Sequence, residues 1–207
     1  MSSSSISRLT ELNAINEVLA AVGQAPVTTL DQTNPDVSII QQTLKNVSRE
    51  VQSEGWHFNR EYNYKLTPQT DQTIAITDNM LQVDLSQRHH ASKDVVRRDG
   101  KLYDKWKEPR EDAYKFDSDV YADITWYFDW LDLPVPIQDY IIARTSTISS
   151  SRLVGDPNQY QILQQREAGK RANVLEYDCN QADYTFFGHP EGENYYISYQ
   201  PYKALYR

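Results

Sequence analysis

The chain has 207 residues, a length that suits one globular domain or one with a small excursion. Its longest uninterrupted apolar stretch, residues 18–22, is far shorter than the roughly 20 residues of a membrane span, and its single cysteine excludes an intrachain disulfide framework. The formal net charge of −8 makes the chain a poor candidate for wrapping nucleic acid, because phosphate neutralisation dominates that affinity.

Two amphipathic helices are predicted within the first 55 residues. Thr10 is a typical N-cap, and Gly23 ends the first helix. The second helix has the start signal Asn34-Pro35-Asp36 and ends at Gly55. The apolar stripes are Leu12, Ile15, Val18, Leu19 and Val22 in the first helix, and Val37, Ile40, Leu44, Val47 and Val51 in the second. We expect the two helices to form an antiparallel pair.

An antiparallel β unit is predicted after these helices, because the apolar period changes from helical spacing to alternation at Trp56. Residues 56–66, 73–77, 81–85 and 120–129 are the predicted strands. Asp99-Gly100 between residues 95–98 and 101–104 is a strong signal for a two-residue hairpin turn. The β unit covers residues 56–133.

Helical spacing returns after Pro136 and continues through two further helices. The third helix has the stripe Ile137, Tyr140, Ile141, Arg144 and Ile148, and the fourth has the looser stripe Tyr160, Leu163, Ala168, Ala172 and Leu175. The predicted fold is therefore α+β: a four-helix bundle (residues 1–55 and 134–182), an inserted antiparallel β unit (56–133) and an extended C-terminal arm (183–207).

Catalytic and cofactor motifs are not found in the sequence. There is no G-x-G-x-x-G, phosphate loop, nucleophile elbow, H-E-x-x-H or C-x-x-C. His89 and His90 are adjacent, so they point in different directions and do not readily share a metal. We expect no catalytic residue, no cofactor and no metal.

One segment keeps an enzymatic alternative open. Asp129 and Asp132 lie among the aromatic residues of 126–132, and glycosidases combine aromatic platforms with two carboxylates. The structural interpretation is favoured, because acids are common at the ends of strands. The alternative function is a glycan hydrolase that uses Asp129 and Asp132 as its two carboxylates.

Charge is distributed in two adjacent blocks of opposite sign. Residues 88–110 hold eight Lys or Arg and four Asp or Glu, for a net charge of +4, whereas residues 111–139 hold one Lys and eight acids, for a net charge of −7. Such blocks make a chain complementary to a copy of itself. The predicted subunit-interface residues are the cations Arg97, Arg98 and Lys101 on one subunit and the acids Asp117, Asp119 and Asp123 on the next. The alternative is two solvated faces.

The C-terminal segment is rich in tyrosine. Gly188, Gly192 and Pro201 favour an extended arm there, and tyrosine suits interfaces because it combines a large apolar area with a hydroxyl group. A final strand packed on the chain's own domain is the alternative. The residues predicted to dock on a partner are Tyr195, Tyr196, Tyr199, Tyr202 and Tyr206.

The N-terminal pattern resembles a known family. The segment 12–19 with Gly23, Pro26-Val27 and Leu30, followed by residues 51–59, is similar to tail tubular protein A, the head-to-tail adaptor of short-tailed bacteriophages. The resemblance implies a dodecameric ring between the portal protein and the tail nozzle protein, contact with a tail fibre protein, and passage of DNA through the lumen without specific binding. It also implies a protein of the virion tail that is assembled in the host cytoplasm, with no membrane partner, and the portal is the partner expected for the tyrosines. With this resemblance, the hydrolase alternative becomes a tail-associated glycan hydrolase acting on host envelope polysaccharide.

Overall fold

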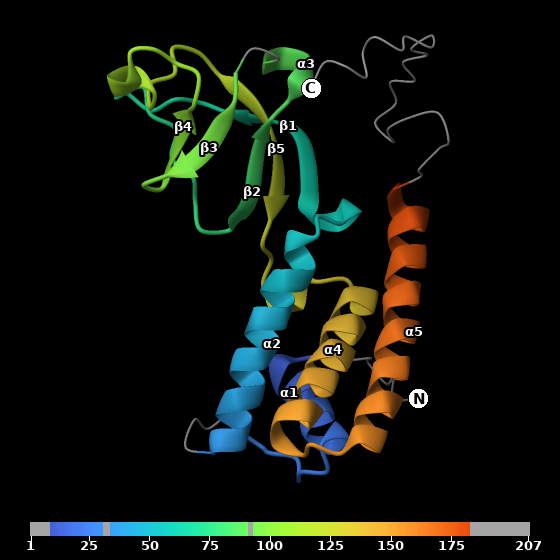
Figure 1. Cartoon of the computed structure of the whole chain (residues 1–207). Helices are drawn as coiled ribbons and strands as arrows, with labels where there is room; N and C mark the ends of the chain where they lie inside the picture. Colours follow the sequence, from blue (N-terminus) through green and yellow to red (C-terminus); the bar gives the residue numbers. More distant parts are fainter. Residues whose placement is uncertain (1–8, 31–33, 91–92, 183–207) are drawn as a thin grey trace, which may run out of the picture.

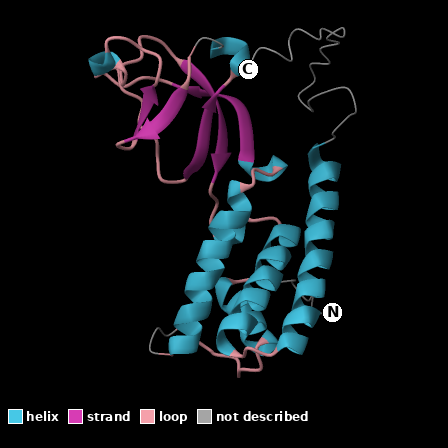
Figure 2. Cartoon of the chain, viewed as in Figure 1, coloured by secondary structure: helices cyan, strands magenta, loops and turns pink. Residues whose placement is uncertain are grey.

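The computed structural model describes residues 9–30, 34–90 and 93–182, and it combines four long helices with small antiparallel sheets (Figure 1; Figure 2). The helices lie side by side, and the strands gather at one end of them. The mixed α+β class is confirmed. The long helices are α1 (Glu11–Ala21), α2 (Pro35–Ser53), α4 (Val135–Leu153) and α5 (Pro157–Ala182).

Both N-terminal helices begin at the predicted caps. The Thr10 hydroxyl accepts a hydrogen bond from the amide of Asn13, 3.3 Å away, and the Asn34 side chain accepts one from the amide of Asp36 at 3.0 Å. Each bond satisfies an amide that has no partner within the helix. The helices end two residues before Gly23 and Gly55, and both glycines adopt the positive φ that ends a helix.

Helix α4 lies at the centre of the helical part, where it packs against α1, α2 and α5. The predicted stripes of α1 and α2 are buried against it, apart from the half-buried Leu12. Ile137, Tyr140 and Ile141 contribute the predicted face of α4 to the same cluster, and Trp56 and Leu133 close the cluster on the side of the β unit. These residues form one continuous hydrophobic core.

The β unit contains a three-stranded antiparallel sheet and a hairpin. Strands β1 (Arg60–Leu66), β5 (Val120–Trp126) and β2 (Met80–Leu85) form the sheet in that order, and β3 (Val95–Arg98) and β4 (Lys101–Asp104) form the predicted hairpin. Short helical turns complete the unit: η1 (His57–Asn59), α3 (Gln87–His90), η2 (Arg110–Asp112) and η3 (Trp130–Asp132). A second hydrophobic cluster, which includes Leu102, Phe116 and Ile124, fills this unit.

The predicted strand limits are corrected at three places. Residues 56–59 form a turn, because the side chain of Asn59 accepts a hydrogen bond from the amide of Trp56 at 2.9 Å. Residues 73–77 make only one isolated bridge, between Ala75 and Lys101, because their backbone meets the hairpin over a very short length. Strand β5 ends at Trp126, because the chain turns into η3 soon afterwards.

The predicted buried face of α5 is wrong for most of its residues. Leu163 is buried, but Tyr160, Ala168, Ala172 and Leu175 are exposed. The physical reason is that α5 packs mainly on α4, so only a narrow side of the helix is covered. Its buried residues are Leu163, Val174 and Ala182.

The predicted C-terminal arm, residues 183–207, lies outside the described residues. The division into a bundle of residues 1–55 and 134–182 with an insertion of 56–133 remains a prediction. Two separate hydrophobic clusters support it, one among the helices and one among the strands.

Candidate assembly surfaces

The predicted interface cations lie on the β3–β4 hairpin and contact groups of their own chain. The Arg97 guanidinium pairs with Asp78 at 2.7 Å, and the Lys101 ammonium lies 3.6 Å from a carboxylate oxygen of Asp71. The Arg98 guanidinium sits over the Tyr103 ring, 4.1 Å from its centroid. Both ion pairs are exposed enough to contribute little to stability, and the side chain of Arg98 is exposed although the Tyr103 ring is buried, so all three cations remain available to a partner.

The predicted interface acids also have contacts within the chain. The Asp119 carboxylate accepts a hydrogen bond from Lys65 at 2.7 Å, and this contact lowers the pKa of Asp119 and raises that of Lys65. Asp117 lies 3.9 Å from the Lys107 ammonium, and Asp123 accepts a bond from the amide of Asn63 at 2.9 Å. Among the described residues, none of the three predicted cations forms an ion pair with any of the three predicted acids.

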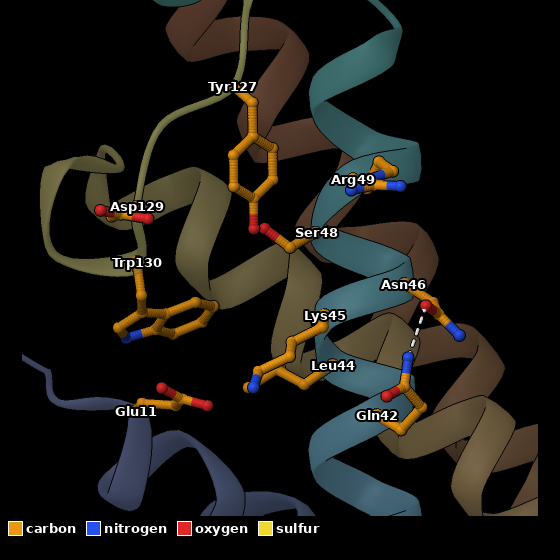
Figure 3. A pocket seen from close by; sticks show the side chains of 10 residues that line it. All are labelled: Glu11, Gln42, Leu44, Lys45, Asn46, Ser48, Arg49, Tyr127, Asp129 and Trp130. Atoms are coloured by element: carbon orange, nitrogen blue, oxygen red, sulfur yellow. Dashed lines mark hydrogen bonds between the residues drawn. The ribbon is translucent and has the colours of Figure 1, made fainter. Parts of the chain in front are cut away.

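A cavity of about 370 Å³ lies between α2, the start of α1 and the connection from β5 to α4 (Figure 3). The indole of Trp130 forms part of its wall and donates to the carbonyl oxygen of Leu9 at 2.9 Å, which fixes the ring. Leu44 supplies an apolar surface. The ten lining residues are Glu11, Gln42, Leu44, Lys45, Asn46, Ser48, Arg49, Tyr127, Asp129 and Trp130.

Charged groups of both signs surround this cavity. Lys45 and Arg49 are one helical turn apart on α2, and both are exposed. Glu11 accepts a hydrogen bond from the side chain of Gln41 at 3.1 Å. In the part of the chain that the structure describes, Lys45, Arg49 and Asp129 form no side-chain hydrogen bond or ion pair, so their charges are available to another molecule.

Asp129 lines the cavity, but Asp132 does not. The two carboxylates of the hydrolase hypothesis are therefore not brought together around one cavity. A glycosidase needs two carboxyl groups on either side of the bond that is broken, and Asp129 and Asp132 do not form that pair at this cavity.

Ion pairs connect α5 to the rest of the helical part. Arg171 forms two bonds to the Glu54 carboxylate, at 3.0 and 2.7 Å, and a third to the Tyr140 hydroxyl at 2.9 Å. These contacts raise the pKa of the Arg171 guanidinium. Arg144 lies between Glu50 and Glu167, and Lys170 pairs with Asp139 at 2.6 Å. Polar contacts thus position a helix that has few buried side chains.

The cavity charges Glu11, Lys45 and Arg49 were not predicted from the sequence. The i, i+4 spacing of Lys45 and Arg49, on the face of α2 opposite its apolar stripe, is the sequence pattern that could have indicated this pair of cations. No local sequence pattern indicates that Glu11 and Trp130 line the cavity, because both residues are distant from α2 in sequence. The five predicted docking tyrosines, 195–206, fall outside the described residues.

Neither a metal site nor a membrane helix is found in the described ranges. No group of three or more His, Cys, Asp or Glu side chains within residues 9–30, 34–90 and 93–182 is arranged to hold a metal ion. Within the same ranges, every helix is too short or too polar to cross a bilayer.

Comparison with known proteins identifies the family. A family model described as tail tubular protein matches residues 12–184, which includes the helices and the β unit. The tail tubular protein A of Klebsiella phage KP34 is 30% identical over 174 residues, covering 83% of this chain and 88% of that protein. The chain therefore belongs to the tail tubular protein A family of structural proteins of phage tails.

Proposed function

We propose that this chain is the adaptor subunit that joins the portal of a short-tailed phage to the tail nozzle. Copies of the chain form a dodecameric ring, DNA passes through the lumen, and the side of the ring helps to anchor tail fibres. The observation that carries the proposal is the family match over residues 12–184. The protein is thus a component of the virion tail, assembled in the host cytoplasm together with portal, nozzle and fibre proteins.

The charge of the chain supports the role of a conduit. A wall that bound phosphates tightly would slow the movement of DNA, whereas a chain with a net charge of −8 repels it on average. A ring also requires heterologous contacts, in which one surface meets a different surface of the next copy. Electron microscopy of the purified protein, alone and mixed with portal, tests the ring directly. Particles without rotational symmetry under both conditions would contradict the proposal.

We propose that the hairpin cations Arg97, Arg98 and Lys101 form part of the ring interface by facing Asp117, Asp119 and Asp123 of the next subunit. A double charge reversal, Arg97→Glu with Arg98→Glu, is expected to reduce ring formation at low salt. The effect is expected to shrink at high salt, because exposed charges are screened over about 8 Å at physiological ionic strength.

The matched control for this variant is Asp78→Ala. It removes the same intrachain pair with Arg97 but leaves the cations in place, so it is expected to assemble normally. Light scattering of the three proteins gives the oligomer size. Equal assembly of the wild type and the double variant at every salt concentration would exclude these residues from the interface.

We propose that the C-terminal tyrosines Tyr195, Tyr196, Tyr199, Tyr202 and Tyr206 dock on the portal. Several buried aromatic side chains, each worth about 1.5–3 kcal/mol, offset the cost of ordering a segment at an interface. Deletion of residues 194–207 tests this role. The truncated chain is expected to melt like the full-length protein and to lose portal binding. Loss of thermal stability in the free subunit would instead place the segment in the chain's own fold.

A further inference from the structure

No segment among the described residues covers the outer face of α5. The residues that face away from α4 recur at alternating spacings of three and four, and all are exposed: Ile162, Gln165, Gly169, Ala172, Glu176 and Cys179. Ile162 has 67% of its surface exposed, and Leu175 beside this stripe has 48%. This spacing keeps one side of a helix directed at a partner over several turns, as in helix–helix contacts.

Gly169 lies in the middle of this face, and no contact among the described residues explains a glycine at this position. A glycine within a helix costs roughly 0.5–1 kcal/mol relative to alanine. Apart from the backbone of its own helix, no atom of the described residues lies within 4 Å of a Cβ atom built at Gly169, so packing among those residues does not require the glycine. The absence of a side chain does allow another backbone to approach α5 closely.

Two charged residues of α5 have no counterpart within the described residues. Arg166 lies beside the outer stripe and Glu176 lies on it, and both are exposed without an ion pair there. They are ten residues apart, a rise of about 15 Å along the helix. By contrast, Glu167, Lys170 and Arg171 on the inner side are all paired.

The charged cavity lies on the opposite side of the bundle from α5. Helices α2 and α5 stand at opposite edges with α4 between them (Figure 1), and no residue of α5 lines the cavity. Glu54, immediately after the end of α2, pairs with Arg171 of α5, whereas Lys45 and Arg49 lie on the other flank of α2. Two surfaces with unpaired charges of both signs are therefore placed where a head-to-tail arrangement of copies brings them together.

We propose that the outer face of α5 docks on the cavity-bearing face of α2 in a second copy of this chain. Glu176 meets Lys45 and Arg49 of the neighbour, and Arg166 meets Glu11 and Asp129. The close approach at Gly169 brings Ile162, which lies on the same stripe, toward the apolar wall around Trp130. This contact is separate from the hairpin contact of the β unit, and it rests on the proposed ring.

Charge complementarity selects a second copy as the occupant. The outer face of α5 and the cavity-bearing face of α2 each carry positive and negative charges. The free subunit therefore stays soluble, and the charges of each face are complementary to those of the other. A strongly charged partner such as DNA is not matched by a face on which two cations stand beside two carboxylates.

A charge-exchange experiment tests the contact. Glu176→Lys and Arg49→Glu, each alone, are expected to raise the subunit concentration for half-assembly about tenfold or more, because like charges then meet. The double variant with both changes is expected to restore assembly, because the pair is re-formed with reversed signs. The matched control is Glu17→Lys on the exposed side of α1, which makes the same charge change as Glu176→Lys and is expected to assemble as the wild type does.

Gly169→Leu provides an independent test that does not depend on charge. A leucine is compatible with the free helix but blocks close approach, so the variant is expected to melt at or above the wild-type temperature and to lose assembly. Sedimentation velocity with and without portal measures both sets of variants.

The outcomes separate this contact from the ring itself. Rings formed by the wild type, by both single charge variants and by Gly169→Leu would overturn the α5 contact while leaving the ring intact. A failure of the double variant to recover would overturn the pairing of Glu176 with Arg49. An absence of rings in the wild type under both conditions would overturn the contact together with the proposed function.

Discussion

Helices α4 and α5 are neighbours in sequence and in space, yet they are buried to very different extents. Eleven of the 19 residues of α4 are buried, against three of the 26 residues of α5. The buried residues of α4 include many small hydroxyl side chains. Two of them, Ser146 and Thr147, donate hydrogen bonds to the backbone carbonyl oxygens four residues earlier. α5 instead relies on ion pairs along one edge.

A helix can therefore lie at the centre of a helical core without being uniformly apolar. Small side chains allow three helices to approach α4 closely, so a Ser- and Thr-rich helix occupies the centre. Ile162 and Leu175 on α5 are exposed and do not have such close helical neighbours among the described residues. We infer that α4 carries the stability of the subunit and that α5 carries contacts between subunits.

The largest expected effect comes from truncating a comparable side chain in each helix. Ile141 of α4 is fully buried, so Ile141→Ala is expected to cost about 2–5 kcal/mol in the free energy of unfolding, from lost burial and a residual cavity. Ile162→Ala in α5 is expected to stay within about 0.5 kcal/mol, because the side chain is mostly exposed. Urea unfolding of both variants measures the difference. Equal losses would contradict the division of roles.

Unpaired hydroxyls within α4 provide the next comparison. Among the described residues, the hydroxyls of Thr145, Ser149 and Ser150 are buried without a hydrogen-bond partner, and such a group costs roughly 1–3 kcal/mol. Ser149→Ala is therefore expected to stabilise the subunit. Ser151→Ala, in the same helix but exposed, changes helix propensity alone.

The measurement is the difference in free energy of unfolding between these two serine variants. Ser149→Ala is expected to exceed Ser151→Ala by at least about 1 kcal/mol. A smaller gain than that of the control would show that the buried hydroxyl has a partner in solution.

Local signals predicted the fold well where the structure depends on local chemistry. The Thr10 and Asn34 caps are confirmed, and so is the hairpin at Asp99-Gly100, where both residues adopt a positive φ as the turn requires. The stripes of α1 and α2 are confirmed because each helix has one strongly apolar side. The face of α5 was not predictable, because its burial depends on where α4 lies and not on its own period.

The candidate surfaces were less accessible to sequence reasoning. The cavity combines Glu11, Lys45 and Trp130 from three segments that only the tertiary fold brings together. The hairpin charges were found as a block, but their partners Asp71 and Asp78 lie outside both blocks and could not be assigned from charge patterning. Composition thus located a charged region without predicting its contacts.

The ion pairs of α5 provide a third, smaller test. Arg171 bonds Glu54 and the hydroxyl of Tyr140 but is partly exposed, so Arg171→Ala is expected to cost roughly 1 kcal/mol. Arg166→Ala on the outer face is expected to leave the free subunit unchanged, because Arg166 has no ion pair among the described residues. Thermal melting at low and high salt compares the two. A comparable loss in both variants would show that α5 has contacts on its outer side within the subunit.

The smallest expected effect is a gain in stability at Gly169. In Gly169→Ala the added methyl group meets no atom of the described residues within 4 Å outside its own helix backbone, and the unfolded chain loses conformational freedom. The free subunit is therefore expected to gain roughly 0.5–1 kcal/mol. The control is Gly155→Ala. Gly155 has a φ of +75°, so the same change there is expected to destabilise. Urea unfolding measures both variants.

Gly169→Ala is also expected to weaken assembly through the proposed α5 contact. A variant that is more stable as a subunit and weaker in assembly places the benefit of the glycine between copies and not within one. A variant that is less stable as a free subunit would instead place a close neighbour beside Gly169 in the fold itself. Helix α5 would then belong to the core of the subunit, as α4 does, and its outer face would not be available to a second copy.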